Sequence, residues 1–159
     1  MVLRHRPGIL TFQMNSRSTQ EAGRHLILYD GICGLCNRLV TEVLPRDPKG
    51  VFHFASLQSA TGRSLLTAQG RNPDILDNMY VVVDYKTGAP RLLGRARAAL
   101  FVIANLESPW RFLKVFGVLP TFLLDAVYAI VARNRYRVFG KLDHCLMPTA
   151  EYESRFVDG

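Results

Sequence analysis

The chain has 159 residues, of which 48% are apolar and 21% are charged. It is long enough to bury the core of one domain, and this composition excludes a fibrous or disordered protein. Three cysteines, an odd number, argue against a secreted disulfide framework and favour a reducing compartment. The net charge of +7 indicates either an anionic partner or a solvated basic surface.

Residues 1–23 predict a flexible N-terminal extension. The first twenty residues carry Arg4, Arg6 and Arg17 but no acid and no long apolar stretch, which excludes a secretory signal core. A basic, acid-poor start is also typical of an organelle transit peptide. We therefore expect a cytoplasmic protein, with organelle targeting as the alternative.

Apolar runs and helical periodicity predict alternating strands and helices in the first half of the chain. A short continuous apolar run that ends at Asp30-Gly31 is typical of a strand buried on both faces, and Pro45 ends the helix that follows. The expected elements are a strand at 26–29, a helix at 35–44, a strand at 51–55 and a helix at 59–68.

The second half predicts a hairpin followed by helices. The expected elements are strands at 80–83 and 91–93 around a turn at 86–88, and helices at 95–106, 110–118 and 121–135. The longest apolar region, 112–132, is interrupted by Lys114, Pro120 and Asp125. Charges at mid-membrane are costly, so this region predicts core helices and no membrane span.

The order strand, helix, strand, helix, strand, strand, helix is similar to that of the thioredoxin core. It implies a crossover connection and a hairpin in one mixed sheet. The expected fold class is therefore α/β: a thioredoxin-like mixed sheet with flanking helices and an added helical C-terminal cap. We expect this domain to span 24–150, with a C-terminal tail at 151–159.

A Cys-x-x-Cys pair, Cys33 and Cys36, stands where the first strand passes into the first helix, a position typical of a redox site. Cys33 would lie at the helix N-terminus, where free N–H groups and the helix dipole favour a thiolate. Cys36 begins the apolar stripe of the helix, so desolvation should keep it a thiol. Gly34 between them permits close approach of another backbone.

Asp30, three residues before Cys33, has two interpretations. Its carboxylate could relay the proton of Cys36, or it could be a turn residue that satisfies backbone groups after the strand.

The cysteine pair also has an alternative interpretation as a structural zinc site. Zinc would need two further ligands, and His144 and Cys145 are the candidates.

The segment Asp30-Gly31-x-Cys33-x-Leu35-Cys36 resembles the signature of the DCC family, thiol–disulfide oxidoreductases named for an Asp-Cys-Cys pattern. Segments 54–59, 134–141 and 145–148 are also similar to the family. The resemblance spans 25–149 and implies a thioredoxin-like fold, with Asp30, Cys33 and Cys36 on the family motif. This chain departs from ordinary thioredoxins at one position. Ordinary thioredoxins place a cis-proline just before the third core strand. Here 77–79, Asp-Asn-Met, occupies that place.

The residues and the resemblance together predict a thiol–disulfide oxidoreductase. Cys33 would attack a substrate disulfide and Cys36 would resolve the mixed disulfide. We expect no bound cofactor, a disulfide-bearing protein or small-molecule thiol as substrate, and no nucleic acid partner. The alternative is a non-enzymatic binding module whose cysteines hold a structural zinc.

Two further expectations concern the C-terminal region. The basic cluster Arg133, Arg135 and Arg137 should recruit an anionic partner rather than serve the chemistry. Cys145 should take no part in the catalytic cycle, because two cysteines complete the exchange and a free cysteine is among the most buried residue types.

Overall fold

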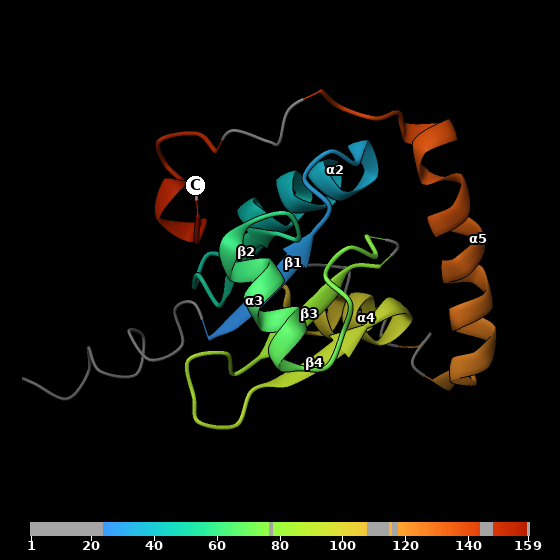
Figure 1. Ribbon diagram of the computed structural model, residues 1–159, viewed down its shortest axis with the longest axis horizontal. Helices are drawn as coiled ribbons and strands as arrows, with labels where there is room; N and C mark the ends of the chain where they lie inside the picture. The colour runs from blue at the N-terminus through green and yellow to red at the C-terminus, as the bar shows by residue number, and fades with distance from the viewer. Residues whose placement is uncertain (1–23, 77, 108–114, 116–117, 144–147, 159) are drawn as a thin grey trace, which may run out of the picture.

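The computed structural model describes residues 24–76, 78–107, 115, 118–143 and 148–158. Most of the helix expected at 110–118, and both His144 and Cys145, lie outside these residues. The described part holds a mixed sheet with helices on both faces (Figure 1). The expected α/β fold with a thioredoxin-like arrangement is confirmed.

The sheet contains β1 (His25–Tyr29), β2 (Phe52–Ser56), β3 (Tyr80–Val83) and β4 (Arg91–Gly94), in the spatial order β2-β1-β3-β4. β1 is parallel to β2 and antiparallel to β3, and β3 is antiparallel to β4. The parallel pair follows from the helical crossover between β1 and β2, and the antiparallel pair from the short hairpin. β1 is thus central, and all five of its residues are buried.

Alternate residues of β1 face opposite sides of the sheet, and a core lies on each side. Ile27 and Tyr29 pack beneath α2 (Gly34–Val43) and α4 (Arg95–Asn105). Leu26 and Leu28 pack with Leu66 of the helix on the other face, α3 (Ala60–Ala68). A strand buried on both faces has a continuous apolar sequence, and this pattern allowed β1 to be predicted.

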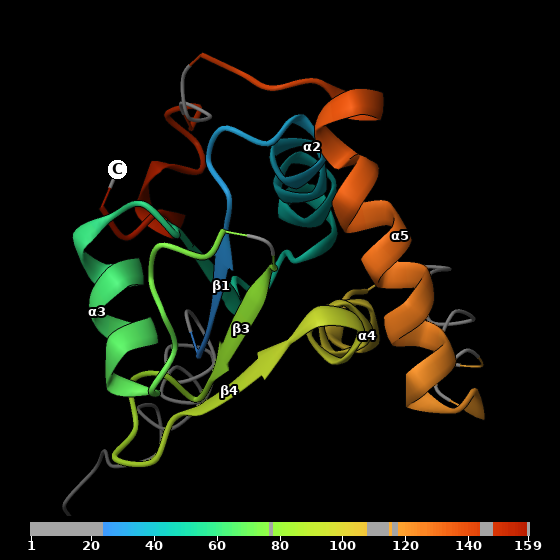
Figure 2. The same cartoon turned by 45° about the vertical axis from the view of Figure 1, so that its right-hand side comes forward.

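The long helix α5 (Thr121–Phe139) is the added C-terminal cap, and it lies outside α2 and α4 and contacts both (Figure 2). It runs past the expected end at Arg135. Its outward side is not a core surface, in contrast to the expectation for this region, because Phe122 and Ile130 are 75% and 61% exposed. None of the helices in the described residues combines the length and apolarity that crossing a membrane requires.

The segment expected as a C-terminal tail is docked on the sheet through η3 (Glu153–Arg155) and the residues after it. Arg155 forms a buried ion pair with Asp47, which follows the short helix η1 (Leu44–Arg46). Phe156 stacks on Phe54 with ring centroids 5.4 Å apart. These contacts complete the apolar core over the edge strand β2.

Candidate functional site

The cysteine pair occupies the junction of β1 and α2 that the sequence indicated. Cys33 is the N-cap residue of α2, and its backbone N–H donates to the Asp30 carbonyl at 3.1 Å. The Cys33 carbonyl accepts from the Asn37 N–H at 3.0 Å. This turn holds the first cysteine at the positive end of the helix dipole.

Both cysteines are free thiols, and both are buried. Burial, followed by the charge on Cys33, raises the pKa of Cys36 to about 12. A backbone hydrogen bond at Asp30 and the Arg135 charge oppose these effects. Cys36 is therefore a protonated thiol at neutral pH. Cys33 is fully buried whereas Cys36 is 8% exposed, although the sequence pattern placed Cys36 deeper in the core.

A segment from the end of α5 covers Cys33, which accounts for this burial. The Gly34 N–H donates to the Gly140 carbonyl at 3.2 Å, and the Leu142 N–H donates to the Ile32 carbonyl at 2.8 Å. A Cβ atom on Gly34 would lie 2.2 Å from the Phe139 carbonyl oxygen. Gly34 thus permits the close backbone approach that its position predicted, but the approaching backbone belongs to this chain. We call residues 139–142 the covering segment.

Gly140 sets the direction of the covering segment. It is the C-cap of α5 and has φ +76°, a left-handed conformation that side chains with a Cβ rarely adopt. This conformation ends the helix and turns the chain across residues 30–36, which we call the cysteine loop.

Asp30 is fully buried, and each of its carboxylate oxygens accepts two hydrogen bonds. One oxygen accepts from the Ile32 N–H at 3.2 Å and from Gln58 Nε2 at 2.7 Å. The other accepts from Arg135 Nη2 at 3.1 Å and from the Tyr136 hydroxyl. The bond to Ile32 is the turn contact that one interpretation predicted. The other three donors tie distant segments to the cysteine loop.

Arg135 does not lie on the surface with Arg133 and Arg137, so the expected cluster is corrected at this position. Its side chain is 6% exposed and forms a buried ion pair with Asp30. Residues two apart on a helix point about 200° apart, so the outer arginines face solvent when the middle one faces inward. Arg135 also donates to the Leu76 carbonyl.

The electrostatic field of Arg135 reaches the cysteines. Burial lowers the pKa of Arg135, but the charges of Tyr136, Cys33 and Cys36 together raise it above its ordinary value. Burial and the hydrogen bond to Asp30 raise the pKa of Tyr136 to about 12. The phenol is therefore a neutral donor to a carboxylate whose charge the guanidinium balances.

α5 also binds the loop before β3, where ordinary thioredoxins have their cis-proline. The Met79 N–H donates to the Tyr128 hydroxyl at 2.9 Å, and Arg135 occupies the Leu76 carbonyl. The described part of the chain contains no cis peptide bond. Side chains of α5 thus form hydrogen bonds with backbone groups on both sides of this position.

Three site residues were missed as functional groups by reasoning from residue type and spacing: Gln58, Arg135 and Tyr136. Gln58 also accepts from the Gly31 N–H at 3.2 Å. All three lie in the segments that resemble the DCC family, and this was the available signal. Their polar contacts depend on how α5 and the loop after β2 fold over the cysteines, which no local pattern encodes.

The zinc alternative depends on His144 and Cys145, which lie outside the described residues. Among the residues that the structure does describe, no three His, Cys, Asp or Glu side chains gather as metal ligands would. His25, the first residue of β1, has a structural role. Its Nδ1 accepts the Asp84 N–H at 3.1 Å.

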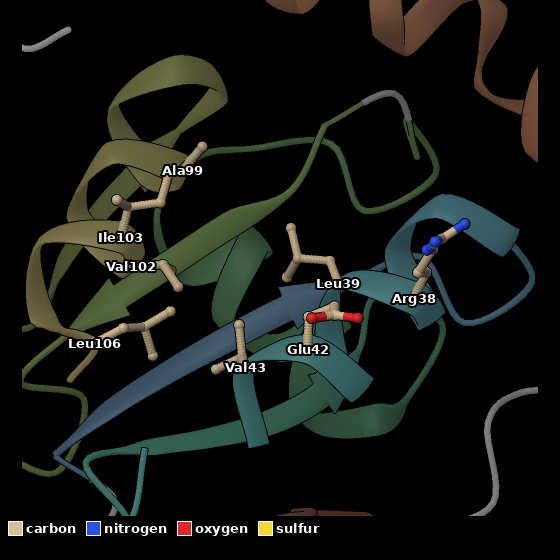
Figure 3. A pocket seen from close by; sticks show the side chains of 8 residues that line it. All are labelled: Arg38, Leu39, Glu42, Val43, Ala99, Val102, Ile103 and Leu106. Carbon is tan, nitrogen blue, oxygen red and sulfur yellow. The ribbon is translucent and has the colours of Figure 1, made fainter. Parts of the chain in front are cut away.

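An apolar groove of about 440 Å³ lies between α2 and α4, apart from the cysteine loop (Figure 3). Leu39 and Val43 form one wall, and Val102 and Leu106 form the other. Six of its eight lining residues are aliphatic, and the two charged ones are Arg38 and Glu42 of α2, so the groove is mainly apolar.

Comparison with known proteins places the chain in a family. The sequence profile described as "DCC1-like thiol-disulfide oxidoreductase" matches residues 27–141. The Bacillus subtilis protein YuxK is 35% identical over 140 residues, covering 88% of this chain and 98% of its own length. The chloroplastic DCC family protein At1g52590 of Arabidopsis thaliana is 34% identical over 127 residues, covering 79% of this chain and 71% of its own. No solved structure matches. The matched residues include the cysteine pair, Asp30 and its partners on α5, and the chain belongs to the DCC1-like thiol-disulfide oxidoreductase family.

Proposed function

We propose that this chain catalyses thiol–disulfide exchange with Cys33 as the attacking and Cys36 as the resolving cysteine. The Cys33 thiolate attacks one sulfur of a substrate disulfide, and the other substrate sulfur leaves as a thiolate. Cys36 then loses its proton and attacks the Cys33 sulfur, which expels the second substrate thiolate. Two electrons pass to the substrate, whose thiolates take up protons, and the enzyme is left with a Cys33–Cys36 disulfide. An external thiol reduces it again.

The observation that carries the proposal is the unequal setting of the two thiols. Cys33 caps α2, where the helix dipole favours an anion. Cys36 is held protonated by burial and by the charge on Cys33. An attacking thiolate beside a protonated resolving thiol is the arrangement that ordered exchange requires.

Access to Cys33 requires the covering segment to move. The residue is fully buried, and two backbone hydrogen bonds, at Gly34 and Ile32, tie the described part of the segment to the cysteine loop. Attack on a disulfide needs direct sulfur–sulfur contact, so lifting this segment is part of the proposed cycle.

Asp30 acts in this proposal as a positioning residue. Its four hydrogen bonds leave neither carboxylate oxygen directed at a thiol proton. The carboxylate fixes Arg135 and Tyr136 next to the loop that carries both cysteines. Proton relay, the other interpretation, predicts that Asp30→Asn slows the resolving step more than it slows the attack. Positioning predicts a loss of folding stability as well.

Trapping experiments test the assignment. Cys36→Ser should accumulate a mixed disulfide at Cys33 in oxidised glutathione, detected by intact mass and peptide mapping, and Cys33→Ser should not. The wild-type protein should show a reversible two-electron couple in glutathione buffers, and Cys145→Ser should match it.

Two outcomes would contradict the proposal. Accumulation at Cys36 in Cys33→Ser, with none at Cys33 in Cys36→Ser, would reverse the roles. Equimolar zinc in the purified protein, lost together with the fold when Cys33 is replaced, would favour the binding module instead.

A further inference from the structure

We infer that a groove beside the cysteine site binds the oxyanion groups of a low-molecular-weight disulfide substrate. This inference rests on the proposed function and specifies its substrate class. Two adjoining hollows, of about 460 and 330 Å³, share Asn78 and Arg95 in their walls. They form one arginine groove, whose cationic lining residues are Arg71, Arg95, Arg97, Arg133 and Arg135.

The charge of the arginine groove is one-sided. Its walls carry a single acid, Asp125, against four arginines besides Arg135, whose charge the buried Asp30 carboxylate balances. Within the described residues, no acidic side chain lies within 4 Å of the four outer arginines, and all four are exposed. Cations that converge without internal partners raise the local concentration of anions. Guanidinium groups also match carboxylates and phosphates bidentately.

Two features place this charge inside a built site. The innermost arginine, Arg135, is 95% buried, yet its Nε has no hydrogen-bond partner among the described residues. Gly94 and Arg95 begin α4, a helix of 11 residues without an acidic side chain in its first turn. The N-terminal end of that helix adds positive potential to the arginine groove.

The arginine groove shares two residues with the hydrogen-bond network around the cysteines. Arg135 and Tyr136 line it, and both also bind the Asp30 carboxylate. Asn78, from the loop before β3, lines both of its hollows. A disulfide bound at the cysteine loop would therefore have its polar ends beside the arginines.

The spacing of the arginines selects the class of ligand. Arg133 and Arg135 belong to one hollow, Arg71 and Arg97 to the other, and Arg95 to both. Separated cations suit a ligand with two or more separated oxyanions better than a single free anion. Carboxylates and phosphates share this chemistry, so the ligand class is a small disulfide that carries several of either group.

The test compares three disulfides: oxidised glutathione with carboxylates, coenzyme A disulfide with phosphates, and the neutral bis(2-hydroxyethyl) disulfide. The groove variant is Arg95→Gln with Arg133→Gln. The matched control is Lys86→Gln with Arg91→Gln, two exposed residues of the β3–β4 hairpin that remove the same charge. In the groove variant, kcat/KM should fall about tenfold or more for an anionic disulfide. It should change by less than about twofold for the neutral one.

The anionic disulfide that loses most identifies carboxylate or phosphate as the recognised group. The control variant should retain its activity toward all three disulfides. An equal loss in the groove and control variants, or an equal loss with the neutral disulfide, would overturn the inference.

Direct binding separates this inference from the proposed function. In the redox-inactive Cys33→Ser, Cys36→Ser protein, titration calorimetry should show binding of an anionic disulfide that weakens on adding Arg95→Gln and Arg133→Gln. If the wild-type protein reduces none of the three disulfides, the proposed function fails while this measurement still decides the groove. Absence of binding by both anionic disulfides would overturn the groove assignment alone.

Discussion

Replacing Arg135 with methionine should destabilise the protein strongly, because it leaves a buried carboxylate without its counter-charge. The Asp30 side chain is fully buried, and that of Arg135 is 6% exposed, with 3.1 Å between Nη2 and the carboxylate oxygen. Breaking a buried pair by removing one partner costs about 3–5 kcal/mol. That is a large part of the roughly 5–15 kcal/mol by which domains are stable. For a chain of this size it corresponds to a fall in Tm of about 6–20 °C.

Urea unfolding followed by circular dichroism measures this loss, and two further variants make it specific. Arg133→Met changes an exposed arginine on the same helix and should shift the unfolding free energy by no more than about 0.5 kcal/mol. Adding Asp30→Asn to Arg135→Met removes the stranded charge, so the double variant should lose less than the sum of the single losses. An unfolding free energy for Arg135→Met within about 1 kcal/mol of wild type, or strict additivity in the double variant, would refute the buried ion pair.

Three other predictions concern the covering segment, the resolving thiol and pH. Gly34→Ala should lower stability by about 1–3 kcal/mol and speed alkylation of Cys33 in the folded protein, because its Cβ would lie 2.2 Å from a carbonyl oxygen. Gly88→Ala, which meets no atom within 4 Å, should do neither. In the double variant Cys33→Ser, Cys145→Ser, the one remaining thiol is that of Cys36. It should show no ultraviolet thiolate absorbance below about pH 10, because burial remains the largest cause of its raised pKa. Burial lowers the pKa of His25 below 6.5, so the unfolded chain binds a proton that the folded chain does not. The unfolding free energy should then fall below pH 6.5, by up to about 1.4 kcal/mol per pH unit for one proton, and less steeply in His25→Asn.

Local sequence patterns were sufficient to predict the elements whose period and caps depend on neighbouring residues. The apolar run of β1 and the helical stripe of α2 located the strand-to-helix junction, and the Cys33–Cys36 spacing marked the candidate site there. These signals are reliable because backbone geometry fixes their periods and caps within a few residues. The hairpin of β3 and β4 could be predicted from the sequence for the same reason.

The groups that surround the cysteines could not be predicted in this way, because they come from distant segments that meet in the folded chain. Helical spacing shows that Arg133 and Arg135 point in different directions, but not which of them faces the core. That choice follows from the packing of α5 on α2 and α4, which brings Arg135 to a carboxylate 105 residues away in sequence. The same packing lays the covering segment over Cys33, for which the sequence pattern indicated only a place at a helix start. Contacts between distant segments depend on how whole faces fit together, and a single sequence carries no local period from which that fit can be read.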